Sequence, residues 1–175
     1  MTTNVFTLVW SGAITLCLLC AALSDIATRS IPDHLSLIVV VLAVPVRLID
    51  HDLLAGLGVA ATVFFILAFA WALRTLGGGD VKLWSACSLL FPPVWLVQSA
   101  FSIRVLLIGG VVATVYLGFR YFAGTLRSTM PDHGIPWLRR LWRIESWRAK
   151  RGVSIPYGVA ISLAALCTLW PSPHG

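Results

Sequence analysis

The chain has 175 residues, of which 58% are hydrophobic and only 11% are charged. An ordinary soluble domain carries about 25% charged residues, and one of this size buries only about 70% of its surface on folding. These numbers exclude a soluble domain, a disordered chain, a coiled coil and a collagen-like chain, and they indicate an integral membrane protein. The net charge of +6 comes from basic residues between apolar runs, which predicts membrane orientation and no nucleic-acid binding.

Apolar stretches predict an all-α, polytopic protein with about six transmembrane helices, forming one membrane-embedded domain over residues 1–175. About 20 apolar residues cross a bilayer as a helix. The first stretch lacks the basic flank and cleavage site of a signal peptide, so we expect a retained span. Prolines 92 and 93 are expected to distort or end the fourth stretch. In chain order the stretches run about Val5–Ser24, Leu35–Ile49, Leu53–Leu76, Val81–Val97, Phe101–Phe122 and Val153–Trp170.

Basic residues predict how these spans are oriented. If the N-terminus lies outside, eleven of the thirteen Lys and Arg residues fall on one side, and only Arg47 and Arg104 fall on the other. Basic loops face the cytoplasm, so both termini are expected on the non-cytoplasmic side. The basic segment at about 123–152 places tryptophans and arginines on different arcs of an amphipathic helix, which suits an anionic inner leaflet. It either anchors the topology or docks a substrate.

Acidic residues near the spans carry the functional information. An Asp at the bilayer centre costs about 2.5–3.5 kcal/mol on insertion scales, so it needs water, a partner or a task. Asp50 and Asp52 lie in a connecting segment and need no special role, and Asp33 is expected to be an N-cap. Asp25 ends the first stretch and Asp80 opens the fourth. Because these stretches enter and leave the cytoplasm, we expect both carboxylates at one depth on the cytoplasmic face.

Paired carboxylates at a low-dielectric site suit peptide hydrolysis. Two such groups share one proton: the ionised member can activate water, and the protonated member can donate to the developing oxyanion. No metal, cofactor or covalent intermediate is required. Gly77, Gly78 and Gly79 carry no Cβ, which would let a substrate backbone approach Asp80. The helix dipole at its N-terminus makes Asp80 the expected ionised member of the pair with Asp25.

Ordinary structural explanations exist for each feature taken alone. A glycine run followed by Asp commonly begins a helix, and Asp25 could pair with Arg29 four residues later. Cys17 and Cys20 form a C-x-x-C, but they lie inside the first apolar stretch, so we interpret them as inert apolar residues. The case for a catalytic site therefore depends on two acids arriving at matching depth.

Three stretches carry a resemblance to a known family. They are Gly77–Leu83 (GGGDVKL), Asp25–Asp33 (DIATRSIPD) and Ile155–Ala160 (IPYGVA). Their order and spacing resemble the type IV prepilin peptidases, which are membrane aspartic peptidases of the GxGD kind. In size the chain is similar to the short members that serve tight-adherence or Flp-type pilus systems.

The resemblance implies that Asp25 and Asp80 are the catalytic pair of a bacterial inner-membrane enzyme whose active site faces the cytoplasm. Its implied substrates are prepilins, with a basic leader cut just after a glycine and an acidic residue early in the mature helix. Lys82 and Arg29 could bind that acid, or they could be topology anchors. Longer members carry cytosolic paired C-x-x-C zinc ligands and methylate the new N-terminus. This sequence shows no cytosolic pair, so peptidase activity alone is expected.

Two other functions stay open at this point. One is a GxGD peptidase with another membrane substrate. The other is a small transporter or ion pathway that uses Asp25 and Asp80 as proton or cation sites. An ion pathway should place acids near the middle of the membrane, whereas these lie at the ends of their stretches, which favours a peptidase. The sequence gives no indication of the oligomeric state.

Overall fold

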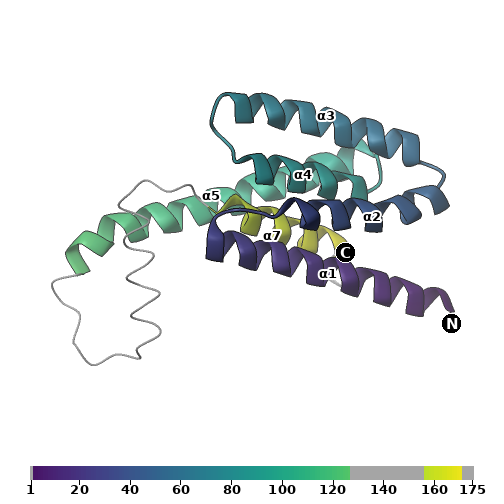
Figure 1. Ribbon diagram of the computed structural model, residues 1–175, viewed down its shortest axis with the longest axis horizontal. Coiled ribbons are helices and arrows are strands. Elements are labelled where there is room, and N and C mark those ends of the chain that lie inside the picture. The colour runs from purple at the N-terminus through teal and green to yellow at the C-terminus, as the bar shows by residue number, and fades with distance from the viewer. Residues whose placement is uncertain (1, 127–155, 171–175) are drawn as a thin grey trace. The chain divides into compact units, whose positions relative to one another are not determined.

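The structure is a computed structural model that describes residues 2–126 and 156–170. It has two compact units, residues 1–109 with 156–175, and residues 110–155. The described residues are all-helical, as predicted, and most of the expected basic segment at 123–152 lies outside them. The helices are α1 (Thr2–Thr28), α2 (Asp33–Ile49), α3 (Leu53–Ala72), α4 (Gly78–Leu90), α5 (Trp95–Leu126) and α7 (Tyr157–Leu169), shown in Figure 1.

The first four helices run in alternating directions, and α7 runs the same way as α2 and α4 (Figure 1). Helices α1 and α3 run one way, and α2, α4 and α7 run the other way. The connections between the first four helices are short, at residues 29–32, 50–52 and 73–77. The C-terminal end of α1 and the N-terminal ends of α2, α4 and α7 therefore lie at the same end of this unit.

Three described helices are long and apolar enough to cross a membrane, over Thr7–Thr28, Leu53–Ala72 and Trp95–Gly118. The other three are shorter: α2 has 17 residues, and α4 and α7 have 13 each. A helix of 13 residues rises about 20 Å, against a hydrocarbon core of about 30 Å. The membrane character is supported, while the number of six spans and the side of each terminus stay predictions.

The boundary between the fourth and fifth stretches differs from the prediction. The fourth stretch was expected to continue to Val97, but α4 ends at Leu90 and α5 begins at Trp95. Pro92 and Pro93 lie between them. Because proline lacks an amide proton and clashes with the preceding turn, this pair ends α4 instead of bending it.

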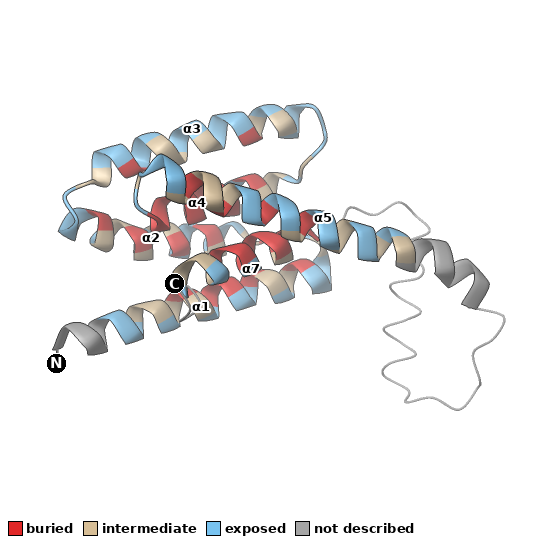
Figure 2. Cartoon of the chain, turned by 180° about the vertical axis from the view of Figure 1, so that it is seen from behind, coloured by how far each residue is buried: buried red, intermediate tan, exposed pale blue. Residues whose placement is uncertain are grey.

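Helix α4 is the interior helix of the first unit. It packs against α2, α3 and α7, and every residue from Val81 to Leu90 is buried except Lys82 (Figure 2). Helix α3, by contrast, exposes large apolar side chains such as Leu54 and Phe65. A helix buried on all sides belongs in a core, and an exposed apolar face suits lipid. The residues at the start of α4 are thus held by packing on several sides.

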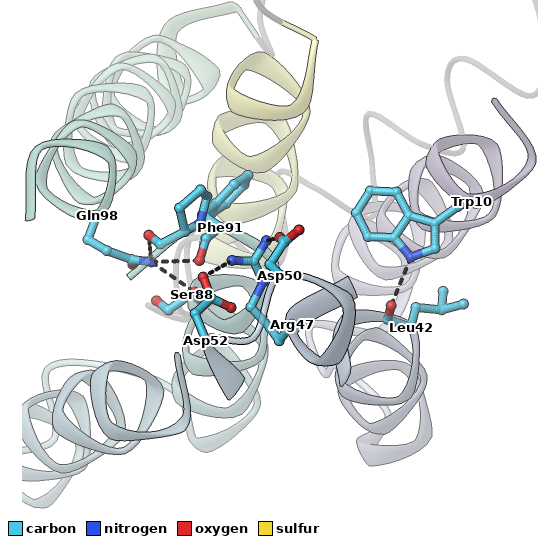
Figure 3. Close-up of polar contacts among 9 residues, drawn as sticks. Trp10, Leu42, Arg47, Asp50, Asp52, Ser88, Phe91 and Gln98 are labelled. Atoms are coloured by element: carbon cyan, nitrogen blue, oxygen red, sulfur yellow. Dashed lines mark hydrogen bonds and ion pairs between the residues drawn. The ribbon is translucent and has the colours of Figure 1, made fainter. Parts of the chain in front are cut away.

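The C-terminal end of α4 is closed by one side chain (Figure 3). Nε2 of Gln98 donates to the carbonyl oxygens of Ser88, Phe91 and Pro92 at 3.0, 3.2 and 3.1 Å. The last carbonyls of a helix have no partner within the helix, so this buried amide replaces the water they would otherwise need.

A buried ion-pair network fixes the C-terminal end of α2 (Figure 3). Arg47 is only 3% exposed, and its guanidinium lies 2.9 Å from Asp50 and 2.7 Å from Asp52. The sequence interpretation that Asp50 and Asp52 need no special role was therefore wrong. Both neutralise a buried charge, and without them Arg47 would be costly to bury.

Candidate active site

Asp25 lies in the last turn of α1 and is bound by the first turn of α7. Its side chain is buried, and the residue is 5% exposed. The amide of Gly158 donates to Asp25 Oδ2 at 2.8 Å, and the amide of Val159 also hydrogen-bonds to this carboxylate. These are the second and third residues of α7. Amides in the first turn of a helix have no partner within the helix, so they commonly bind anions.

Asp80 is the third residue of α4 and is half-buried. Its carboxylate accepts a hydrogen bond from the amide of Gly77, which is the N-cap residue of the same helix. This is one half of a capping box, in which the third helical residue reaches back to the N-cap amide. The spacing of Gly77 and Asp80 in the sequence is therefore explained locally, because Asp80 binds the amide at the start of its own helix.

The two carboxylates interact. Asp80 lies outside the three segments long enough to span a membrane, and its pKa is raised to about 7, first by burial and then by the negative charge of Asp25. A carboxylate has this effect only when it is near, because the interaction weakens with distance and with screening. Residues 55 positions apart in the sequence therefore act on each other at one end of the first unit.

Ile31 packs against the first turns of both α4 and α7. It lies in the connection between α1 and α2 and is 7% exposed. A Cβ at Gly79 would lie 3.1 Å from Ile31 Cβ, and a Cβ at Gly158 would lie 2.7 Å from Ile31 Cδ1. The first turns of α4 and α7 can approach Ile31 this closely only because both positions are glycine. Sequence reasoning did not single out Ile31 for this role.

Each glycine of the run has different surroundings. A Cβ at Gly77 would meet Asp80 Oδ2 at 2.8 Å, and one at Gly79 would meet Ile31. A Cβ at Gly78 would reach only the indole of Trp71, at 3.4 Å. The sequence interpretation was that these glycines admit a substrate backbone. The structure adds a packing requirement for Gly77 and Gly79, and Gly78 is the least restricted of the three.

The two basic residues considered for substrate binding follow the acids in the sequence, Arg29 four residues after Asp25 and Lys82 two residues after Asp80. Lys82 is exposed, and its Nζ lies 2.8 Å from both carboxylate oxygens of Asp33. The expectation that Asp33 caps α2 was wrong, because Pro32 occupies the N-cap position and Asp33 is the first helical residue. Arg29 follows α1 with a φ of 57°, and its charge acts on Asp25.

The first turn of α7 is the part of the site that sequence reasoning missed. Residues 156–160 attracted attention only through the family resemblance, with no role for their amides, and Ile155 lies outside the described residues. A proline followed closely by glycine at a helix start was the available signal. Within the described part of the chain, no three His, Cys, Asp or Glu residues cluster as metal ligands would, and Cys17 and Cys20 form no disulfide.

Residues 12–118 match the type IV leader peptidase family. The chain belongs to this family. The resemblance inferred from the sequence is confirmed, and membership of the family indicates a protease and implies a membrane setting and a pilin-like substrate. The matched range contains Asp25 and Asp80 and ends before α7. No curated protein and no solved structure matches this chain significantly.

Proposed function

We propose that this protein is an aspartic endopeptidase that removes the basic leader of prepilins at the cytoplasmic face of a bacterial inner membrane. Asp25 and Asp80 are its catalytic pair, and it lacks the methyltransferase activity of longer members. The observation that carries the proposal is the packing of two helix starts against one side chain, Ile31: Gly79 precedes Asp80, and Gly158 donates to Asp25. Membership of the family supplies the class of reaction.

The chemistry needs only the two carboxyl groups and water. The ionised carboxylate takes a proton from water as the water oxygen bonds to the scissile carbonyl carbon. The protonated carboxyl gives its proton to the carbonyl oxygen, which yields a neutral tetrahedral intermediate. The intermediate then collapses as the C–N bond breaks. The amine leaves with the proton held by the first carboxyl group, and the hydroxyl proton returns to the second.

The position of the pair supports a peptidase over an ion pathway. Asp25 lies in the last turn of α1 and Asp80 in the first turn of α4, so both acids lie at helix ends and not midway along a span. Charged residues that carry ions through a membrane are expected deeper in the bundle. A scissile bond next to a transmembrane segment would meet carboxylates at this level.

Substrate binding by Lys82 and Arg29 belongs to the same proposal. An acidic residue early in the mature helix of a prepilin would pair with one of these cations. Because Lys82 already contacts Asp33, its binding to a substrate would exchange one carboxylate for another. Lys82 would then be paired with a carboxylate both before and after the substrate binds.

Asparagine substitution tests the catalytic pair. We expect Asp25→Asn and Asp80→Asn each to leave the protein inserted in the membrane but to abolish leader removal, because neither variant has both an acid and a base. The measurement is the gel mobility of a co-expressed prepilin. Asp50→Asn is the matched control, since Asp50 lies beyond the far end of α2 and should leave processing intact. Full processing by both site variants would exclude this mechanism.

A further inference from the structure

We propose that the first turn of α7 holds Asp25 as the ionised member of the pair, which leaves Asp80 as the member that carries the proton. The inference rests on the proposed peptidase function and assigns each acid its part in it. Asp25 would then be the base that activates water, and Asp80 the acid that protonates the substrate carbonyl. Gly158 and Val159 would be positioning residues that act through their backbone amides.

The contacts of Asp25 favour the charged form of its carboxylate. Two amides donate to it, from Gly158 at 2.8 Å and from Val159, and hydrogen bonds to an ionised acceptor are stronger than those to a neutral one. The carboxylate also lies at the N-terminus of α7, where the helix dipole stabilises a negative charge. Burial disfavours the charged form of Asp25, whereas the two amide donors and the positive charge of Arg29 favour it.

The contacts of Asp80 favour the neutral form. One amide, that of Gly77, donates to its carboxylate, while burial and the Asp25 charge both raise its pKa, to about 7. Among the described residues, the side-chain charges that act on Asp25 are those of Arg29 and, across the pair, Asp80. The contribution of α7 is from backbone amides. The pair therefore has one anion that backbone amides hold, Asp25, and one carboxyl group that retains its proton, Asp80.

This assignment reverses the one expected from the sequence. There, the dipole of α4 made Asp80 the expected anion. In the structure a second helix, α7, directs its N-terminus at Asp25, and nothing in the sequence near Asp25 indicates this contact. Gly158 allows it, because a Cβ at this position would lie 2.9 Å from Asp25 Oδ2 and 3.0 Å from Asp25 Cβ.

Two glycine variants test the two acids separately. Gly158→Ala places a methyl group against Asp25 Oδ2, and Gly77→Ala places one 2.8 Å from Asp80 Oδ2. The measurement is kcat/KM against pH for a purified prepilin with a basic leader. We expect Gly158→Ala to move the acidic limb to higher pH by about one unit, because the base loses its donors. We expect Gly77→Ala to move the basic limb to higher pH, because the acid loses the amide that favours its charged form.

The controls separate this effect from general loosening. Gly58→Ala is the matched substitution, since a Cβ there meets nothing within 4 Å, and its profile should equal that of the wild type. Val159→Pro removes the second donor without the crowding at position 158, and should move the acidic limb in the same direction. Adding Ile31→Val to Gly158→Ala relieves the contact with Ile31 Cδ1 but not the one with Asp25, so the shift should persist.

Several results would overturn the assignment. A Gly158→Ala enzyme with an altered basic limb alone would reverse the two roles. A uniform loss of rate with both limbs unmoved, an unchanged profile, or recovery of the wild-type profile on adding Ile31→Val would reduce α7 to a packing element. If Gly158→Ala fails to fold, the Val159→Pro profile decides in the same way. Activity in Asp25→Asn and Asp80→Asn would instead remove the proposed function itself.

Discussion

Asp80 links the protonation of the site to the stability of the fold. Its pKa is raised from the ordinary value near 4 to about 7, so between these values the folded state binds more protons than the unfolded state. A raised pKa of this kind contributes stability at low pH that is lost as the pH rises through about 7. Free energy of unfolding should therefore fall between pH 5 and pH 8.

We expect Asp80→Asn to flatten this dependence. The variant has no titrating group at position 80, so its thermal midpoint in detergent should change less between pH 5 and pH 8 than that of the wild type. Asp50→Asn serves as a control and should keep the wild-type slope. A wild-type midpoint that rises steadily over this range would contradict the protonation state inferred for Asp80.

Gly79 tests how closely α4 approaches the connection between α1 and α2. A Cβ there would lie 3.1 Å from Ile31 Cβ and 3.3 Å from the Ile31 carbonyl oxygen, and backbone atoms cannot move aside cheaply. We expect Gly79→Ala to lower the free energy of unfolding by about 1–3 kcal/mol, as overpacking does. Gly78→Ala should cost much less, since it meets only the edge of Trp71. Equal stability of the two variants, by thermal unfolding in detergent, would contradict this packing.

At the scale of the elements, the ion-pair network of Arg47 joins α2 to the connection that follows it. Replacing both partners, Asp50→Asn with Asp52→Asn, leaves a buried guanidinium without a counter-charge. We expect a loss of about 3–5 kcal/mol, as for other broken buried pairs. The single variant Asp50→Asn keeps the 2.7 Å contact of Arg47 with Asp52 and should lose much less.

The readout that separates stability from catalysis is the pH profile. Because the Arg47 network lies at the opposite end of α2 from Asp33, the double variant should keep the wild-type limbs of kcat/KM at a temperature where it is folded. A shifted limb would show that the two ends of the helix are coupled. Unchanged stability would show that the Arg47 charge is compensated elsewhere.

Features with local causes could be predicted from the sequence, and features that depend on tertiary contacts could not. Apolar runs predicted six helices, and the two prolines marked the end of α4 within a few residues. The meeting of Asp25 with Asp80 followed from counting the directions of successive spans. The contact of Asp25 with Gly158 could not be predicted, because span directions do not say which backbone amide at this end meets which carboxylate. The pairing of Arg47 with Asp50 and Asp52 could not be predicted, because the sequence does not reveal that Arg47, near the end of its helix, is buried.

At the scale of the whole molecule, the expected topology can be tested directly. After replacement of the native cysteines, Ser30→Cys should react with a membrane-impermeant thiol reagent only from the cytoplasmic side. His51→Cys should react only from the opposite side, because it lies at the other end of α2. Both residues are exposed. Labelling of Ser30→Cys from outside intact cells would place the pair on the wrong side for cutting leaders in the cytoplasm.

The packing of Ile31 against two glycines has a consequence for catalytic rate. One apolar side chain packs against the starts of both α4 and α7, so under the proposed mechanism it would fix the spacing of Asp25 and Asp80 before any polypeptide arrives. Groups placed in advance need little rearrangement during bond breaking, which lowers the barrier. Changes of specificity can then alter side chains farther from Ile31, while this hydrophobic spacer preserves the spacing of the two helix starts.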